Sequence, residues 1–110
     1  MNKTKNLTVK EIFILAVQNH QQNKLQEATN YYNQVLETRP NHAQSLNNLG
    51  TIFQKLRENQ KATIYFKKAI KINPNYAAAH YNFGNSLQIE GKLQKAKNCY
   101  EKAIEINPNY

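Results

Sequence analysis

The sequence predicts an all-α fold, an α–α superhelix (solenoid) of three helix–turn–helix units with six antiparallel helices. The first observation is a repeat, because Pro40, Pro74 and Pro108 recur at equal intervals along the chain. The second is a set of small residues that recurs with the same spacing, Gly50, Ala62 and Ala69 in one unit and Gly84, Ala96 and Ala103 in the next. A fixed period of this length is typical of proteins in which each unit buries its apolar face only against its neighbours.

The helices follow in order from apolar residues spaced three and four apart, as in amphipathic helices. A polar lead, 1–7, precedes a repeat domain at 8–110, whose units span about 9–42, 43–76 and 77–110. The predicted helices span about 9–22, 25–38, 42–56, 59–72, 76–90 and 93–106. Consecutive helices within a unit are joined by short turns, so we expect three antiparallel hairpins.

Capping residues indicate where the helices begin. Thr8 and Glu11 have the spacing of a capping box, in which each side chain bonds the other residue's backbone N–H. Asn41 is expected to cap the third helix, with Gln44 three residues on, and Asn75 the fifth.

The turns inside the units differ from one another. Asn23 and Gly91 suit the left-handed conformation that ends a helix, whereas Arg57 occupies the equivalent place in the middle unit. We expect this middle turn to be the weakest of the three.

Gly50 and Gly84 lie inside predicted helices, where glycine costs about 1 kcal/mol relative to alanine. That cost is tolerable where a facing helix leaves no space for a side chain. Ala62 and Ala96 are the residues that we expect to face them.

The unit resembles the tetratricopeptide repeat, a helix–turn–helix of about 34 residues, over 9–110. The middle unit has the family's pattern residues at Leu46, Leu49, Gly50, Phe53, Ala62, Phe66, Ala69 and Pro74. The third has them at Phe83, Gly84, Leu87, Ala96, Tyr100, Ala103 and Pro108, with His80 where Trp is frequent. The first has them at Ile12, Leu15, Ala16, Ala28, Tyr32, Val35 and Pro40. The resemblance implies a scaffold that binds other proteins, with the first helix of each unit lining a concave face.

The resemblance places a peptide-binding surface on that concave face. Its predicted residues are Lys10, Phe13, Asn47, Asn48, Thr51, Lys55, Tyr81, Asn82 and Asn85. Asn48 and Asn82 are equivalent in successive units, and an amide can both donate to and accept from a peptide backbone. They resemble the asparagine ladder in the repeat arm of O-GlcNAc transferases. The alternative is that they are solvated asparagines, because the chain has seventeen.

A carboxylate clamp of the kind found in chaperone-tail binders is disfavoured. Lys10 fits one of its places, but Ala78 and Asn82 stand where the third unit would supply cations. Any partner peptide is therefore expected to be held through its backbone rather than through a charged tail.

The sixth predicted helix has an apolar side with no following helix to cover it. We expect self-association through Leu93, Tyr100, Ala103, Ile104 and Ile106. Two explanations stay open: the chain is the N-terminal piece of a longer protein, or another copy of it covers this end.

The composition argues against an enzyme. The chain has no Asp, its seven Glu are scattered over outer helical faces, and no Gly-rich phosphate loop is present. The three His lie in different units, away from the single Cys99, so no metal or cofactor is expected. No run approaches the roughly 20 apolar residues of a membrane helix, and no secretory signal pattern occurs, so a cytoplasmic location is expected.

The net charge of +8 has two interpretations. One is nucleic-acid or anionic-membrane binding through lysines of the outer helices, Lys61, Lys67, Lys68, Lys71, Lys92, Lys95, Lys97 and Lys102. The other, which we favour, is the codon bias of an AT-rich genome, because the chain has thirteen Lys, seventeen Asn and nine Ile. Glu101 and Glu105 also dilute the basic face in the third unit. Together with the lack of catalytic residues, the resemblance to the tetratricopeptide repeat implies a non-catalytic protein-interaction scaffold. The alternatives are a substrate-docking arm of a larger enzyme, such as a bacterial glycosyltransferase, and a basic nucleic-acid-binding face.

Overall fold

The structure is a computed structural model that describes residues 6–110, in which six helices and no strands occur. They are α1 (Val9–Gln21), α2 (Leu25–Thr38), α3 (Ala43–Lys55), α4 (Asn59–Ile72), α5 (Ala77–Ile89) and α6 (Leu93–Ile106). Each matches a predicted helix to within one residue at either end. Of the predicted polar lead, residues 1–5 lie outside the described part of the chain.

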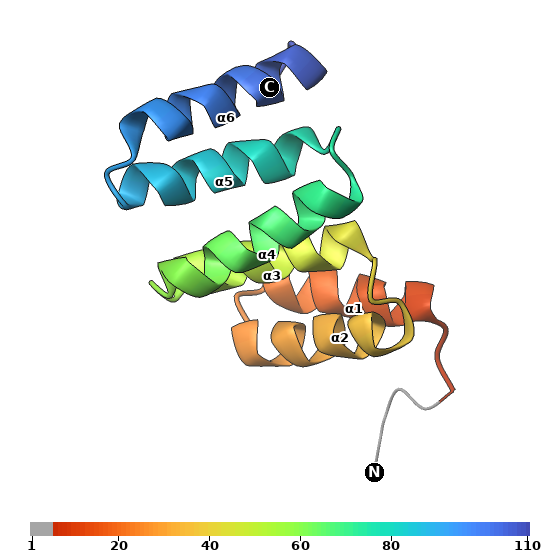
Figure 1. The fold of residues 1–110 in the computed structure, drawn as a ribbon. Coiled ribbons are helices and arrows are strands. Elements are labelled where there is room, and N and C mark those ends of the chain that lie inside the picture. The colour runs from red at the N-terminus through yellow and green to blue at the C-terminus, as the bar shows by residue number, and fades with distance from the viewer. Residues whose placement is uncertain (1–5) are drawn as a thin grey trace.

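The helices pair into three hairpins, α1–α2, α3–α4 and α5–α6, which stack along the longest axis of the molecule (Figure 1). The extents are 48 × 26 × 22 Å. Each hairpin packs on the next through α2 against α3 and α4 against α5. Because α3 also contacts α5, the first helices of the second and third hairpins lie side by side. We call the side of the molecule formed by α1, α3 and α5 the inner side. The predicted all-α superhelix is confirmed.

The first capping prediction is confirmed and the next two are wrong. The Thr8 N–H donates to Glu11 Oε1 at 3.0 Å, and the Glu11 N–H donates to Thr8 Oγ1 at 3.1 Å. The α3 helix is instead capped by His42, because α3 begins one residue later than the pattern of Asn41 suggested. Similarly, Tyr76 is the residue before α5, and it provides no side-chain cap.

The three turns share one backbone conformation. Asn23, Arg57 and Gly91 have φ values of 61°, 64° and 78° in the left-handed region. Glycine adopts this conformation without a penalty and asparagine does so with a small one, but a long side chain is disfavoured there. Arg57 therefore introduces local strain into the middle turn.

The prediction of which residues face Gly50 and Gly84 is wrong. A Cβ atom added at Gly50 would lie 2.4 Å from Cε1 of Phe66, and one at Gly84 would lie 2.8 Å from Cε1 of Tyr100. The aromatic rings of the second helices, rather than the expected Ala62 and Ala96, therefore occupy the space beside the glycines. The reason is that a ring reaches across the hairpin from a residue one turn further along the helix.

Polar side chains also join the middle and third units. The Gln54 side-chain amide donates to Ser86 Oγ at 3.1 Å, and the Asn59 side-chain amide donates to the Ser86 carbonyl at 3.1 Å. Asn59 stands where the other units have Leu25 and Leu93, so a hydrogen bond to α5 replaces an apolar contact at this place. Within residues 6–110, no helix combines the length and the hydropathy needed to cross a membrane.

Candidate functional site

The inner side of α1 and α3 contains a hollow of about 460 Å³ near the start of both helices. Its lining combines apolar, cationic and polar side chains: Thr8, Val9, Lys10, Phe13, Ile14, Arg39, His42 and Gln44. Lys10 and Ile14 are exposed, whereas Phe13 is half-buried against the Tyr32 ring at a centroid distance of 6.0 Å. Two residues of the predicted site, Lys10 and Phe13, therefore lie together here.

His42 links this hollow to the start of α3. Its Nδ1 accepts from the Ser45 N–H at 3.2 Å, and its ring lies 4.8 Å from that of Phe13 between centroids. Burial, with a smaller contribution from the Arg39 guanidinium, holds the pKa of His42 below its usual value of 6.5. The imidazole is therefore neutral at pH 7, with Nδ1 free of a proton and able to cap the helix.

The predicted concave-face residue Asn47 is not available to a ligand. It is 4% exposed, its Oδ1 accepts from Asn82 Nδ2 at 3.1 Å, and its Nδ2 donates to the Tyr76 hydroxyl at 3.4 Å. This part of the prediction is wrong, because the α3–α5 contact covers a position that the repeat pattern places on the open face. Asn47 and Asn82 instead join the middle and third units.

Asn48 and Thr51 are half-buried on the same helix. Burial raises the pKa of Tyr32 to about 12, and a hydrogen bond from the Asn48 side chain offsets part of that rise. The Thr51 hydroxyl donates to the Asn48 backbone carbonyl at 2.7 Å. The exposed Lys55 donates through Nζ to Asn23 Oδ1 at 2.6 Å, which ties the end of α3 to the turn of the first unit.

Tyr81 and Asn85 lie at the other end of the inner side, beside the C-terminus. Tyr81 is exposed, and its ring is 5.6 Å from that of Tyr100 and 5.3 Å from that of Tyr110. The Tyr100 hydroxyl lies 2.6 Å from Asn85 Oδ1 and 2.8 Å from Gln88 Oε1, and donates to one of them at a time. The structure therefore divides the predicted face into two clusters, one around Phe13 and one around Tyr81.

The residues of the predicted self-association surface differ in exposure. Leu93 is 65% exposed and Ile104 52%, whereas Tyr100 and Ile106 are half-buried. Ala103 is only 1% exposed, so it is a packing residue of the third hairpin and forms no outward contact surface. A hollow of about 370 Å³ lies between α5, α6 and the C-terminal residue. It is lined by Tyr81, Asn85, Gln88, Tyr100, Ala103, Ile104 and Tyr110.

Sequence reasoning did not identify Arg39 or His42 as part of the hollow in the first unit. Arg39 follows the last residue of α2, and the repeat pattern assigns no face to such a position. The one available signal was that both residues lie within two positions of Pro40, where the chain passes from one unit to the next. Within residues 6–110, no group of three or more His, Cys or Glu side chains could hold a metal ion.

Comparison with known proteins agrees with this architecture. The family profile described as tetratricopeptide repeat matches residues 43–76 and 77–110, and a second profile of the same description matches 14–42. No curated protein matches the sequence.

Many solved structures are similar in fold, and two of them serve as examples. The first tetratricopeptide domain of Spaghetti (RPAP3), bound to the HSP90 peptide SRMEEVD, has a TM-score of 0.87 at 22% identity, over 93% of this chain and 81% of that one. The crystal structure of MamA has a TM-score of 0.83 at 22% identity, over 93% of this chain and 60% of that one. The repeat period, the stacked hairpins and the matched residues together show that this chain belongs to the tetratricopeptide repeat family.

Proposed function

We propose that the chain is a non-catalytic scaffold that binds an extended segment of a partner protein along the inner side of α1, α3 and α5. The observation that supports this most directly is the hollow beside Phe13. It offers the exposed apolar surface of Ile14 next to the cationic groups of Lys10 and Arg39. Such a surface suits a segment with an apolar side chain next to a carboxylate.

The proposed partner differs from the peptide in the RPAP3 complex in how it is held. That peptide, SRMEEVD, contains three acidic residues. In this chain Ala78 and Asn82 give α5 no cation on the inner side, and the cations Lys10 and Arg39 belong to the first unit and the loop after it. We therefore propose a single acidic contact at the first unit, with backbone contacts beyond it.

The backbone contacts are assigned to Asn48 and Asn82, which are half-buried and lie one unit apart. The Asn48 side chain bonds Tyr32, and Asn82 donates one amide hydrogen to Asn47. We assign the remaining donors and acceptors of the two amide groups to a peptide. Each neutral hydrogen bond adds about 0.5–1.5 kcal/mol, so two such contacts support weak binding on their own. An apolar anchor in the hollow beside Phe13 is needed for affinity.

The test uses peptides selected from a random display library on the wild-type chain. Ile14→Glu is expected to lower their affinity at least ten-fold. Ile64→Glu is the matched control, because Ile64 on α4 is 52% exposed and Ile14 is 45% exposed. The double variant Asn48→Ala/Asn82→Ala is compared with Asn98→Ala on the outer side of α6. Equal binding by Ile14→Glu and Ile64→Glu would remove the hollow from the proposal, and equal binding by the asparagine variants would remove the ladder.

Self-association through the end of α6 is a second candidate, favoured by the exposed Leu93 and Ile104. Light scattering over a range of concentrations tests it: the mass is expected to rise with concentration, and Leu93→Lys/Ile104→Lys is expected to keep the chain monomeric. A role as the docking arm of a larger enzyme uses the same inner side. It depends on whether a catalytic domain is encoded next to this chain, which the native gene would show.

A further inference from the structure

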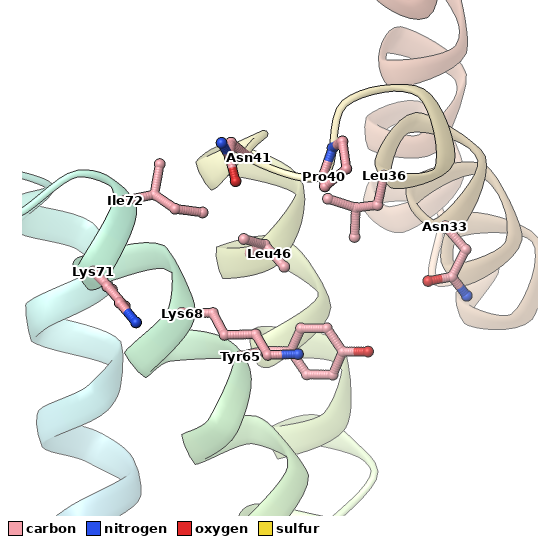
Figure 2. A pocket seen from close by; sticks show the side chains of 9 residues that line it. All are labelled: Asn33, Leu36, Pro40, Asn41, Leu46, Tyr65, Lys68, Lys71 and Ile72. Carbon is pink, nitrogen blue, oxygen red and sulfur yellow. The ribbon is translucent and has the colours of Figure 1, made fainter.

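Another hollow lies between α2 and α4, the second helices of the first two hairpins. Its volume is about 680 Å³, within the range of roughly 300–1,000 Å³ that is usual for binding pockets. We call it the outer cleft, and its lining residues are Asn33, Leu36, Pro40, Asn41, Leu46, Tyr65, Lys68, Lys71 and Ile72. Figure 2 shows these side chains converging from α2, the following loop, α3 and α4.

The outer cleft has an apolar floor and a cationic rim. Leu46 of α3 lies at its centre in Figure 2, between Leu36 on one side and Ile72 on the other. Lys68 and Lys71 belong to α4, and the Lys68 ammonium lies 5.4 Å from the centroid of the Tyr65 ring. In the described part of the chain, neither ammonium has a carboxylate within salt-bridge distance, and no Glu lines the cleft.

The next repeat provides an internal comparison. In the next repeat, His80 stands at the position equivalent to Leu46, and Glu105 at the position equivalent to Lys71. The lysine equivalent to Lys68 is Lys102, whose Nζ pairs with Glu105 at 3.6 Å. The same place between α4 and α6 therefore has a paired charge and a polar ring, whereas the outer cleft has a leucine and two lysines without a carboxylate partner among the described residues.

We propose that the outer cleft binds an acidic peptide segment of a partner protein that carries one bulky apolar side chain. The apolar side chain packs on Leu46, between Leu36 and Ile72. Carboxylates next to it in the segment meet Lys68 and Lys71, since charge-assisted hydrogen bonds to ammonium groups are the stronger kind. This site is independent of the inner side, so the chain can hold two segments at once.

A nucleic acid fits this site less well. Binding of single strands depends on aromatic rings with an open face for bases and on a row of cations along the backbone. The Tyr65 ring stacks on Phe53 at a centroid distance of 5.3 Å and also carries the Lys68 ammonium. The faces of the Tyr65 ring are therefore already occupied. The apolar floor of the cleft offers no hydrogen-bond donor to a phosphate.

The experiment measures binding by fluorescence polarisation with the labelled peptide acetyl-EEFEE-amide. The wild-type chain is expected to bind it, and to bind acetyl-EEGEE-amide about ten-fold more weakly, since that peptide lacks the apolar anchor. Lys71→Glu reproduces the charge of the next repeat and is expected to weaken binding about ten-fold. Lys67→Glu is the matched control, because it changes the net charge equally on the same helix but does not line the cleft. It is expected to change the affinity less than three-fold.

Three results would overturn the proposal. They are no binding of acetyl-EEFEE-amide to the wild type at millimolar concentration, an equal loss in both lysine variants, and full competition by a short poly-uridine oligonucleotide. The inner-side variant Ile14→Glu separates this proposal from the one above. It is expected to leave acetyl-EEFEE-amide binding unchanged, and a ten-fold loss would place the peptide on the inner side instead.

Discussion

Gly50→Ala tests how closely α3 and α4 approach each other. The added Cβ would lie 2.4, 2.7 and 2.9 Å from three ring atoms of Phe66, and real Cβ contacts are essentially never that short. Phe66 is fully buried, so its ring cannot move aside without displacing the core around it. The substitution therefore forces the hairpin apart.

Two opposing terms set the magnitude. Alanine is favoured over glycine inside a helix by about 1 kcal/mol, whereas overpacking a filled core costs about 1–3 kcal/mol. With three contacts under 3.0 Å, the overpacking term lies at its upper end, so Gly50→Ala is expected to lower the free energy of unfolding by about 1–2 kcal/mol. For a domain near this size, that corresponds to a fall in melting temperature on the order of 5–10 °C.

Gly84→Ala is the internal control. Its added Cβ would meet Tyr100 at 2.8, 3.0 and 3.2 Å, which is less close than at Gly50, and Tyr100 is half-buried whereas Phe66 is fully buried. The gain in helix propensity then offsets most of the contact penalty, and the stability change is expected to stay within about 0.5 kcal/mol.

Thermal and urea unfolding followed by circular dichroism measure both variants. Gly50→Ala combined with Phe66→Leu is expected to show a favourable coupling energy in a double-mutant cycle, because the smaller side chain makes room for the new methyl group. Gly50→Ala combined with Ala62→Gly is expected to show none. If Gly50→Ala were as stable as the wild type, or if only the Ala62 change rescued it, the assignment of the ring as the facing group would be refuted.

Three further predictions concern a turn, the histidines and a buried amide. Arg57→Gly is expected to raise the free energy of unfolding by about 0.5–1 kcal/mol, because the φ of 64° at this position suits glycine. Urea titration measures the change. If Arg57→Gly were no more stable than Arg57→Ala, the prediction would be contradicted. The pKa values of His20 and His42 are held below 6.5, mainly by burial, so the unfolded chain takes up protons first on acidification. The free energy of unfolding is therefore expected to be greatest above pH 6.5 and to decrease below it. His42→Asn, which keeps a capping side chain, is expected to make this decrease smaller. Asn47→Ala is expected to lower the free energy of unfolding by about 1–3 kcal/mol, since it leaves the partly buried amide of Asn82 without its acceptor. The control Asn98→Ala, on the outer surface, is expected to lower it by less than about 0.5 kcal/mol. Similar values for the two variants would show that the hydrogen bonds of Asn47 contribute little.

The architecture was predictable from the sequence because it depends on local signals. The repeat interval places three prolines, and each of them follows the second helix of a hairpin. The capping box of Thr8 and Glu11 is local too, because both residues belong to one helical turn. Spacing along one chain segment is enough to predict such features, and the family follows from the same residues.

What the tertiary structure decided is which residues meet between helices. Asn47 was predicted to line the open face, but the approach of α5 buries it against Tyr76 and Asn82. The ring of Phe66, rather than Ala62, reaches Gly50. The outer cleft likewise depends on the separation of α2 from α4 over Leu46. These contacts join residues distant in sequence, and they are set by the angles and distances at which helices pack, which a repeat pattern does not contain.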